Sequence, residues 1–196
     1  MQRLLLAADR LSAGVGKTFA WAILLLIGVT VYDVTARYAF NAPTGWAYDT
    51  EYILYGTLFV MAGPYALARN AHVRGDVIYR LLPVRVQGAI DFVLYLLFFF
   101  PGVIALLYSG YEFAAMSWMM REHSSSSPDG PPIYPFKALI PLAALFLVVQ
   151  GVAELVRAWQ ALRTGQWPAR LHDAEETEVV LSEKHPADGA RAGGRP

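Results

Sequence analysis

The sequence predicts an all-α integral membrane protein with four transmembrane helices, and two observations lead to this class. Of the 196 residues, 56% are apolar and only 16% are charged, whereas soluble domains carry about a quarter charged residues. In addition, the apolar residues collect in four successive uncharged runs, each near the ~20 residues that a helix needs to cross a bilayer. A chain of this length accommodates four such spans and their connecting loops.

The four runs differ in length. The third is the clearest, since Phe92–Tyr111 contains no charged residue, and Pro101 within it predicts a kink. The others, Thr18–Tyr32, Tyr52–Ala68 and Ala138–Ala153, are shorter, so each needs a flanking turn to complete a span. With these turns included, the predicted spans are about 18–38, 48–68, 90–111 and 137–158.

The segments outside the spans have compositions of their own. Residues 1–17 combine leucines with basic residues, which predicts an interfacial N-terminal segment ahead of a transmembrane domain over residues 18–170. Residues 171–196 are charged, contain glycine and proline and lack aromatic side chains, so we expect a disordered cytoplasmic tail. A cleaved signal peptide is disfavoured, because Asp33 and Arg37 follow the first run where small residues would be needed.

The basic residues indicate an orientation. Ten Lys and Arg residues lie before the first span, between the second and third, or just after the fourth, whereas the opposite loops hold Arg37, Arg121 and Lys137. The positive-inside rule then predicts that both termini are cytoplasmic (N-in, C-in) and that two loops are external. The second external loop, Glu112–Lys137, contains four consecutive serines and several prolines, so we expect it to be irregular.

Composition also excludes several functions. The 16 Lys and Arg residues balance the 16 Asp and Glu residues, which disfavours a nucleic-acid partner. The chain has no cysteine, and its four histidines lie outside the apolar runs without the spacing of metal or haem ligands. We therefore expect no cofactor, no metal site and no enzymatic activity.

One short motif partly matches the sequence pattern of a phosphate-binding loop. Gly16, Lys17 and Thr18 match the end of that motif, but Leu11 stands where its first glycine is required. No strand pattern precedes the motif and an apolar run follows it, so we interpret it as a chance match.

Ionisable residues at the ends of the spans are the candidate functional groups. Asp33 and Arg37 are four residues apart and can pair on one helix face. Asp49 and Glu51 begin the second span, where the helix dipole favours anions. Two further acids near span ends are Glu112 and Glu154. Because none lies at a span centre, capping and pairing are the first interpretation, and a transport pathway is the second.

A series of short motifs runs from the end of the first span into the loop after the second. It comprises Arg37-Tyr38-Ala39-Phe40-Asn41, Trp46, Asp49, Glu51, Ala68–Val77 and Leu82-Pro83. In this order and spacing, the chain resembles the small membrane subunit (DctQ type) of the tripartite ATP-independent periplasmic (TRAP) transporters over roughly residues 18–160. Two positions depart from the family pattern, because Thr50 separates the two acids and Gly75 replaces a branched residue.

The resemblance implies a non-catalytic, multi-pass scaffold in the bacterial inner membrane. Such a subunit lies among membrane lipids, packs against a large transport subunit and helps to dock a periplasmic substrate-binding protein. The system it serves would take up an organic anion, typically a carboxylate, by sodium-coupled symport. An alternative is a stand-alone small four-helix transporter that works as a homodimer, with Asp33 as its coupling carboxylate. The neighbouring Arg37 disfavours free titration of that group.

The resemblance also implies roles for individual residues. Asp33 and Arg37 would form a structural ion pair. The candidates to face the binding protein are Trp46, Asp49, Glu51, Glu112, Arg121 and Glu122. The candidates for lipid or subunit contacts around the cytoplasmic loop are Arg69, His72, Arg74, Asp76, Arg80 and Arg85.

Overall fold

The computed structural model describes residues 2–70, 79, 81–127 and 130–168. Within this part of the chain every regular element is helical, and one isolated bridge joins His123 to Pro132. The all-helical class predicted from the sequence is therefore confirmed. The predicted tail, residues 171–196, lies outside the described residues.

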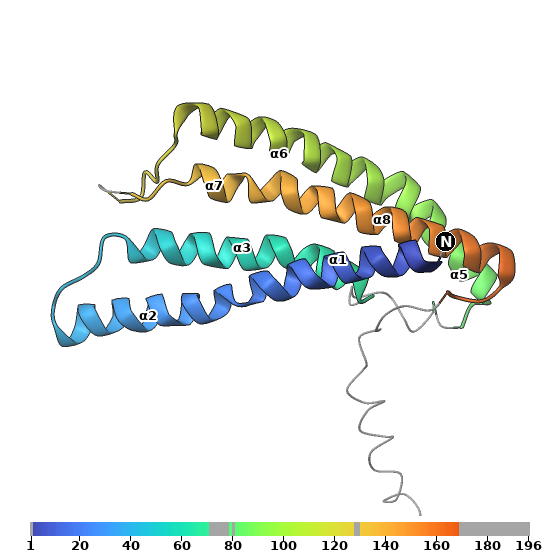
Figure 1. The fold of residues 1–196 in the computed structure, drawn as a ribbon, viewed down its shortest axis with the longest axis horizontal. Helices are drawn as coiled ribbons and strands as arrows, with labels where there is room; N and C mark the ends of the chain where they lie inside the picture. Colours follow the sequence, from blue (N-terminus) through green and yellow to red (C-terminus); the bar gives the residue numbers. More distant parts are fainter. Residues whose placement is uncertain (1, 71–78, 80, 128–129, 169–196) are drawn as a thin grey trace, which may run out of the picture.

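The first half of the chain forms a long helical hairpin (Figure 1). Helix α1 (Gln2–Ala20) leads almost directly into α2 (Ala22–Ala39), and the chain returns as α3 (Ala47–Ala68). The described part of the segment predicted as interfacial, residues 2–17, thus belongs to a helix that packs against α3. At 1.5 Å per residue, α1 and α2 together are about 57 Å long, which exceeds the ~30 Å hydrocarbon layer.

The second half forms another hairpin beside the first. Its outward arm consists of α5 (Val84–Leu94), the π-helical turn η1 (Tyr95–Phe99) and α6 (Phe100–Met120). Its return arm consists of the short α7 (Tyr134–Lys137) and the long α8 (Leu139–Thr164). Helices α3 and α8 lie in the middle, because α3 contacts α1, α2 and α8, while α8 also contacts α5 and α6.

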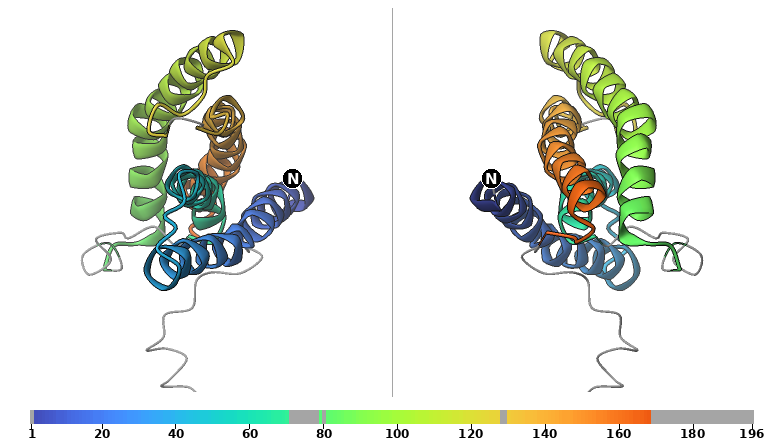
Figure 2. Two further views of the ribbon diagram at one scale, coloured as in Figure 1. Left: turned by 90° about the vertical axis from the view of Figure 1, so that its left-hand side faces the viewer. Right: turned by 90° about the vertical axis from the view of Figure 1, so that its right-hand side faces the viewer.

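The outward arm bends where the sequence contains a proline. The π-helical turn η1 ends two residues before Pro101, which lies in the first turn of α6. Figure 2 shows the arm changing direction between α5 and α6. Proline has no N–H for the helical ladder, and a π-turn accommodates the gap with one wider turn. Helix α6 then continues through Glu112 to Met120, beyond the start of the predicted loop, because Phe113, Ala114 and their neighbours keep the helix apolar.

Within the described residues, three helical stretches are long and apolar enough to cross a membrane: Gln2–Ala39, Val84–Met120 and Tyr134–Thr164. Helix α3 has 22 residues and is long enough, at about 33 Å, to be a fourth. Its tyrosines, Pro64 and two acids near its start reduce its hydropathy, and a fourth span there stays a prediction. The N-in, C-in orientation likewise stays a prediction.

The distribution of apolar side chains is that of a membrane protein. Large side chains are exposed on the outer arms, such as Leu25 on α2 at 63% and Phe98 on η1 at 72%. The fully buried apolar positions are mostly small, and Ala144, Ala158 and Ala161 are each 0% exposed. Small residues let helices approach closely where lipid offers no hydrophobic driving force between them. The outer faces of α2 and α6 are therefore available to lipid or to another membrane subunit.

Candidate functional site

Polar side chains gather at the two opposite ends of the hairpins, and we describe the end with the connections α2–α3 and α6–α7 first. We call it the serine-loop end, after Ser124–Ser127. Asp33, near the end of α2, accepts a hydrogen bond from Arg37 Nη2 at 2.8 Å and another from Thr44 Oγ1. Trp46 stacks on Tyr32 with ring centroids 5.9 Å apart. These contacts hold the α2–α3 connection against α2.

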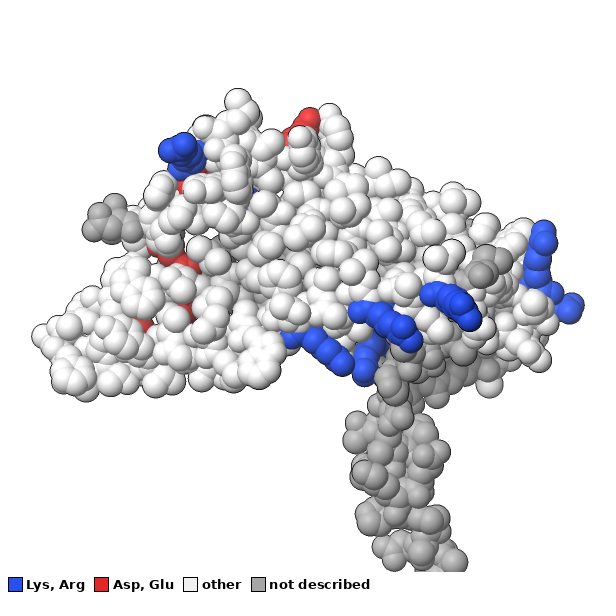
Figure 3. Space-filling view, viewed as in Figure 1, with Lys and Arg blue, Asp and Glu red and all other residues white. Residues whose placement is uncertain are grey.

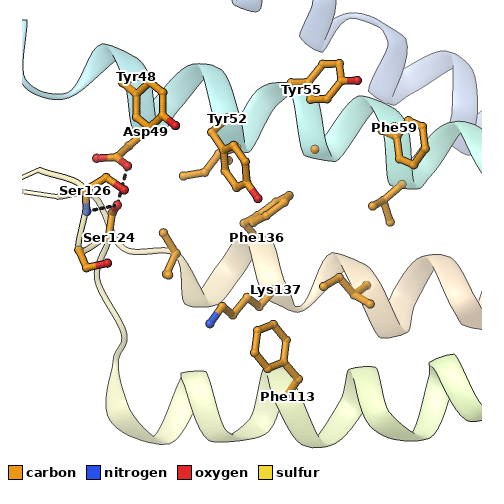
Figure 4. A pocket seen from close by; sticks show the side chains of 16 residues that line it. Tyr48, Asp49, Tyr52, Tyr55, Phe59, Phe113, Ser124, Ser126, Phe136 and Lys137 are labelled. Carbon is orange, nitrogen blue, oxygen red and sulfur yellow. Dashed lines mark hydrogen bonds between the residues drawn. The ribbon is translucent and has the colours of Figure 1, made fainter.

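Asp49 joins the two loops at this end. Its side chain lies in the first turn of α3 and the residue is only 5% exposed. Ser124 Oγ donates to Asp49 Oδ1 at 2.5 Å (Figure 4). Ser127 Oγ lies 2.6 Å from Asp49 Oδ2. Ser127 Oγ is also 2.5 Å from the carbonyl oxygen of Gly45. The serine run therefore folds back onto the start of α3 through a buried carboxylate.

An ion pair fastens the other side of the serine loop. Lys137 Nζ, at the end of α7, lies 2.5 Å from Glu122 Oε2 and 4.0 Å from the centroid of the Phe113 ring. The hydrogen bond from Lys137 lowers the pKa of the Glu122 carboxyl below its usual value. The loop between α6 and α7 is thus closed by a half-buried ion pair.

A cavity of about 720 Å³ lies beneath these contacts, between α3, α6 and α7. Figure 4 shows aromatic rings from these three helices around it, with Phe136 lying between Tyr52 and Phe113. The Phe136 ring also covers Gly56, where a Cβ atom would come within 2.5 Å of Phe136 Cζ. The cavity is apolar, with polar groups at its loop-facing end.

A buried ion cluster lies at the opposite end and joins α1 to α8. It consists of Asp9, Ser12, Gln150, Glu154 and Arg157, each at most 2% exposed. Arg157 donates two hydrogen bonds to Asp9, from Nη1 to Oδ1 at 3.0 Å and from Nη2 to Oδ2 at 2.6 Å. Arg157 Nη1 also lies 2.5 Å from Glu154 Oε1. One guanidinium therefore serves two carboxylates.

Neutral side chains complete this cluster. Gln150 Nε2 donates to Asp9 Oδ1 at 2.9 Å and to Glu154 Oε1 at 3.3 Å, and Ser12 Oγ donates to Gln150 Oε1 at 3.0 Å. Buried charges are tolerated when they are paired and hydrogen-bonded in this way. The cluster therefore fixes the contact between two helices that lie far apart in the sequence.

The remaining candidates from the sequence are spread over both ends. Glu51 on α3 is half-buried, Glu112 on α6 is exposed, and Arg121 is exposed with a left-handed backbone (φ 46°) that ends α6. Arg69 is half-buried and stacks over Tyr65 at 5.4 Å. The candidates His72, Arg74, Asp76 and Arg80 lie outside the described residues, and Arg85 is exposed.

Sequence reasoning missed the buried ion cluster, although a signal for it exists. Asp9 and Ser12 are three residues apart on α1, and Gln150, Glu154 and Arg157 are spaced by four and three on α8. Each set therefore forms a polar stripe on one helix face. What the spacing does not show is that the two stripes face each other.

The arrangement is that of a helical membrane protein held together by polar contacts at its two ends. Among the described residues, no group of three or more His, Asp or Glu side chains could hold a metal ion.

The chain belongs to the DctQ family. The model of the family described as tripartite ATP-independent periplasmic transporters, DctQ component, matches residues 26–161. This match confirms the resemblance drawn from the motifs, and the chain is a small component of a TRAP transporter. No curated protein matches the chain. The family match begins within α2, so Asp9, Ser12 and the rest of α1 precede it.

Proposed function

We propose that this chain is the non-catalytic scaffold subunit of its transporter. It packs against the large transport subunit and presents the serine-loop end to the periplasmic substrate-binding protein. The complete system takes up an organic anion, in the typical case a carboxylate, by sodium-coupled symport in the bacterial inner membrane. The observation that carries the proposal is the DctQ match over most of the chain.

The arrangement of polar groups supports a scaffold role. The charged residues of the buried ion cluster contact one another, and Asp33 is engaged by Arg37 and Thr44. A proton- or sodium-coupled site needs a carboxylate that can change partners during transport. The apolar outer faces of α2 and α6 offer the lateral surface that a large membrane subunit needs.

The proposed orientation places the serine-loop end in the periplasm. Arg3, Arg10, Lys17, Arg69 and Arg163 then lie at the cytoplasmic end, as the positive-inside rule favours. Alkaline phosphatase inserted after Ser125 should be active, since the enzyme folds in the periplasm, and the same enzyme fused after Trp167 should be inactive. The reverse pattern would overturn the orientation.

The test of the scaffold role is co-expression of the tagged chain with the large TRAP subunit of the same organism, followed by purification in mild detergent. We expect a stable heterodimer that shows sodium-dependent uptake with its binding protein in proteoliposomes, whereas the small chain alone transports nothing. The alternative, a homodimeric transporter, predicts uptake by the small chain alone and its loss in Asp33→Asn. That result would overturn the scaffold role.

A further inference from the structure

The seam between α1 and α3 contains two adjoining cavities of different chemistry. The first, about 270 Å³, is lined by Asp9, Arg10, Ala13, Gly14, Lys17, Ala68 and Arg69. The second, about 220 Å³, is lined by Gly16, Lys17, Phe19, Ala20, Leu58, Ala62 and Tyr65. Lys17 borders both cavities. We propose that the seam binds one anionic phospholipid, with its phosphate in the first cavity and an acyl chain in the second.

Three cationic side chains give the first cavity its charge. Arg10 and Lys17 are exposed on one face of α1, seven residues apart, and Arg69 closes the cavity at the end of α3. Among the described residues, no carboxylate forms an ion pair with any of these three. Figure 3 shows most of the visible Lys and Arg side chains on the half of the molecule that holds α1 and α5. The cavity therefore favours an anion.

The acid in this cavity does not cancel that charge. Asp9 faces the cavity from the buried ion cluster, where Arg157 binds both of its oxygens. The cluster as a whole has two carboxylates and one guanidinium, so it carries an excess of one negative charge. The three cations that line the cavity, Arg10, Lys17 and Arg69, outweigh this single negative charge by two. A net positive charge suits a phosphate group.

The position of Arg69 is held by packing. Gly16 lets α1 approach α3, because a Cβ atom there would lie 2.5 Å from Tyr65 Cβ. Tyr65 in turn lies beneath the Arg69 guanidinium, 5.4 Å from ring centroid to Cζ. Nε of Arg69 is buried and has no hydrogen-bond partner among the described residues. The Arg69 guanidinium therefore lies at the cavity with one N–H donor that has no hydrogen-bond acceptor among the described residues.

The second cavity explains why the occupant is a lipid. It continues along the same seam toward the middle of α3, and its lining apart from Lys17 is apolar or aromatic. Helix α3 ends at Ala68, so the first cavity lies at the level of the headgroups if α3 crosses the bilayer. A charged pocket that opens into an apolar groove at this depth matches a headgroup and its chain.

This inference is independent of the proposed function, because it concerns the chain alone. Its test is native mass spectrometry of the purified full chain in detergent, titrated with phosphatidylglycerol or phosphatidylcholine. We expect one phosphatidylglycerol to bind in preference to phosphatidylcholine. Removing each basic side chain, as in Arg10→Gln, Lys17→Gln or Arg69→Gln, should weaken binding about fivefold, and the triple variant about a hundredfold.

Two controls separate the site from general charge attraction. Arg3→Gln removes an exposed cation of α1 that does not line either cavity, and it should leave binding unchanged. Lys17→Arg keeps the charge and should retain binding. Ala62→Phe fills the apolar groove without altering charge, and it should weaken phosphatidylglycerol binding.

Three results would overturn the proposal. One is equal loss of binding in Arg3→Gln and Lys17→Gln, which would indicate attraction without a site. Another is unchanged binding in the triple variant. The third is displacement of the lipid by millimolar inorganic phosphate together with no effect of Ala62→Phe, which would assign the first cavity to a soluble phosphate.

Discussion

The two ends of the molecule hold carboxylates in opposite ways. In the buried ion cluster, the side chains of Asp9 and Arg157 are 2% and 0% exposed, and the partners come from α1 and α8. At the serine-loop end, the side chains of Glu122 and Lys137 are 32% and 13% exposed, and the partners flank a single loop. The same pairing of charges thus occurs once in the fully buried interior and once at a half-buried site.

This difference indicates which parts of the chain are rigid. A buried charge that loses its partner is not solvated by water, so breaking one ion pair of the cluster is costly. The contact between α1 and α8 is therefore expected to be rigid. The half-buried pair at the serine-loop end is partly solvated and costs less to break. Once the hydrogen bonds to Asp49 are also broken, the loop can open without unfolding the helices. This combination suits the proposed scaffold role, because helix positions stay fixed while a loop adapts to the proposed partner protein.

The largest expected effect comes from breaking the buried ion cluster. Arg157→Met leaves Asp9 and Glu154 as two buried carboxylates without their guanidinium, and we expect a loss of about 3–5 kcal/mol in unfolding free energy. Thermal unfolding in detergent, followed by tryptophan fluorescence, measures it. The matched control is Arg163→Met on the same helix, where an exposed arginine stacks on Trp159 at 4.5 Å and should contribute about 0.5–1 kcal/mol.

A second variant checks that charge is the cause. Adding Asp9→Asn and Glu154→Gln to Arg157→Met removes the two carboxylate charges that the Arg157 guanidinium had compensated. The triple variant should therefore recover part of the lost unfolding free energy. If Arg157→Met and Arg163→Met destabilise equally, or if the triple variant is less stable than the single one, the cluster does not have the role described.

A smaller effect is expected at Asp49. Asp49→Ala leaves Ser124 without its acceptor and leaves Ser127 with the carbonyl oxygen of Gly45 alone. An unsatisfied hydroxyl at a partly buried site costs about 1–3 kcal/mol. Because these contacts involve one loop, we expect faster hydrogen exchange in residues 121–127 with the helices unaffected. Glu51→Ala is the control, since among the described residues no hydrogen bond or ion pair joins Glu51 to Ser124–Ser127. Equal loosening in both variants would show that the loop does not depend on Asp49.

Much of the fold could be predicted from local sequence signals. Uncharged runs indicate membrane helices because lipid tolerates few charges, and the motif from Arg37 to Asn41 indicates the family. The Asp33–Arg37 spacing places both groups on one helix face, and the structure has them 2.8 Å apart. These features depend on residues close in the chain, which is why the sequence alone reveals them.

The rest depends on contacts between distant residues. Asp9 lies in a segment whose leucines and basic residues predict an interfacial helix, yet its polar face packs against Gln150 and Arg157. Asp49 was a candidate because of its position at a helix start, but its partners are 75 and 78 residues away. A period of 3.6 shows which residues share a face and leaves open which helix that face meets.

The smallest expected effect is the pH response of the half-buried ion pair between Lys137 and Glu122. The hydrogen bond from Lys137 holds the pKa of Glu122 below its usual value, so the folded carboxyl stays charged to lower pH than the unfolded one. Its contribution to stability is therefore full above the unfolded pKa of about 4.3 and is lost as pH falls through the lower folded value.

Lys137→Met isolates this contribution. We expect the wild type to melt at a slightly higher temperature than Lys137→Met near neutral pH, and the difference to disappear as the pH falls through the lowered pKa of the folded Glu122 carboxyl. Arg121→Met removes an exposed cation next to Glu122 and should give a melting-temperature difference that stays small across the same range. A Lys137→Met difference that is the same at pH 7 and pH 3 would mean that Lys137 stabilises the loop through its contact with Phe113, and that the ion pair contributes nothing measurable.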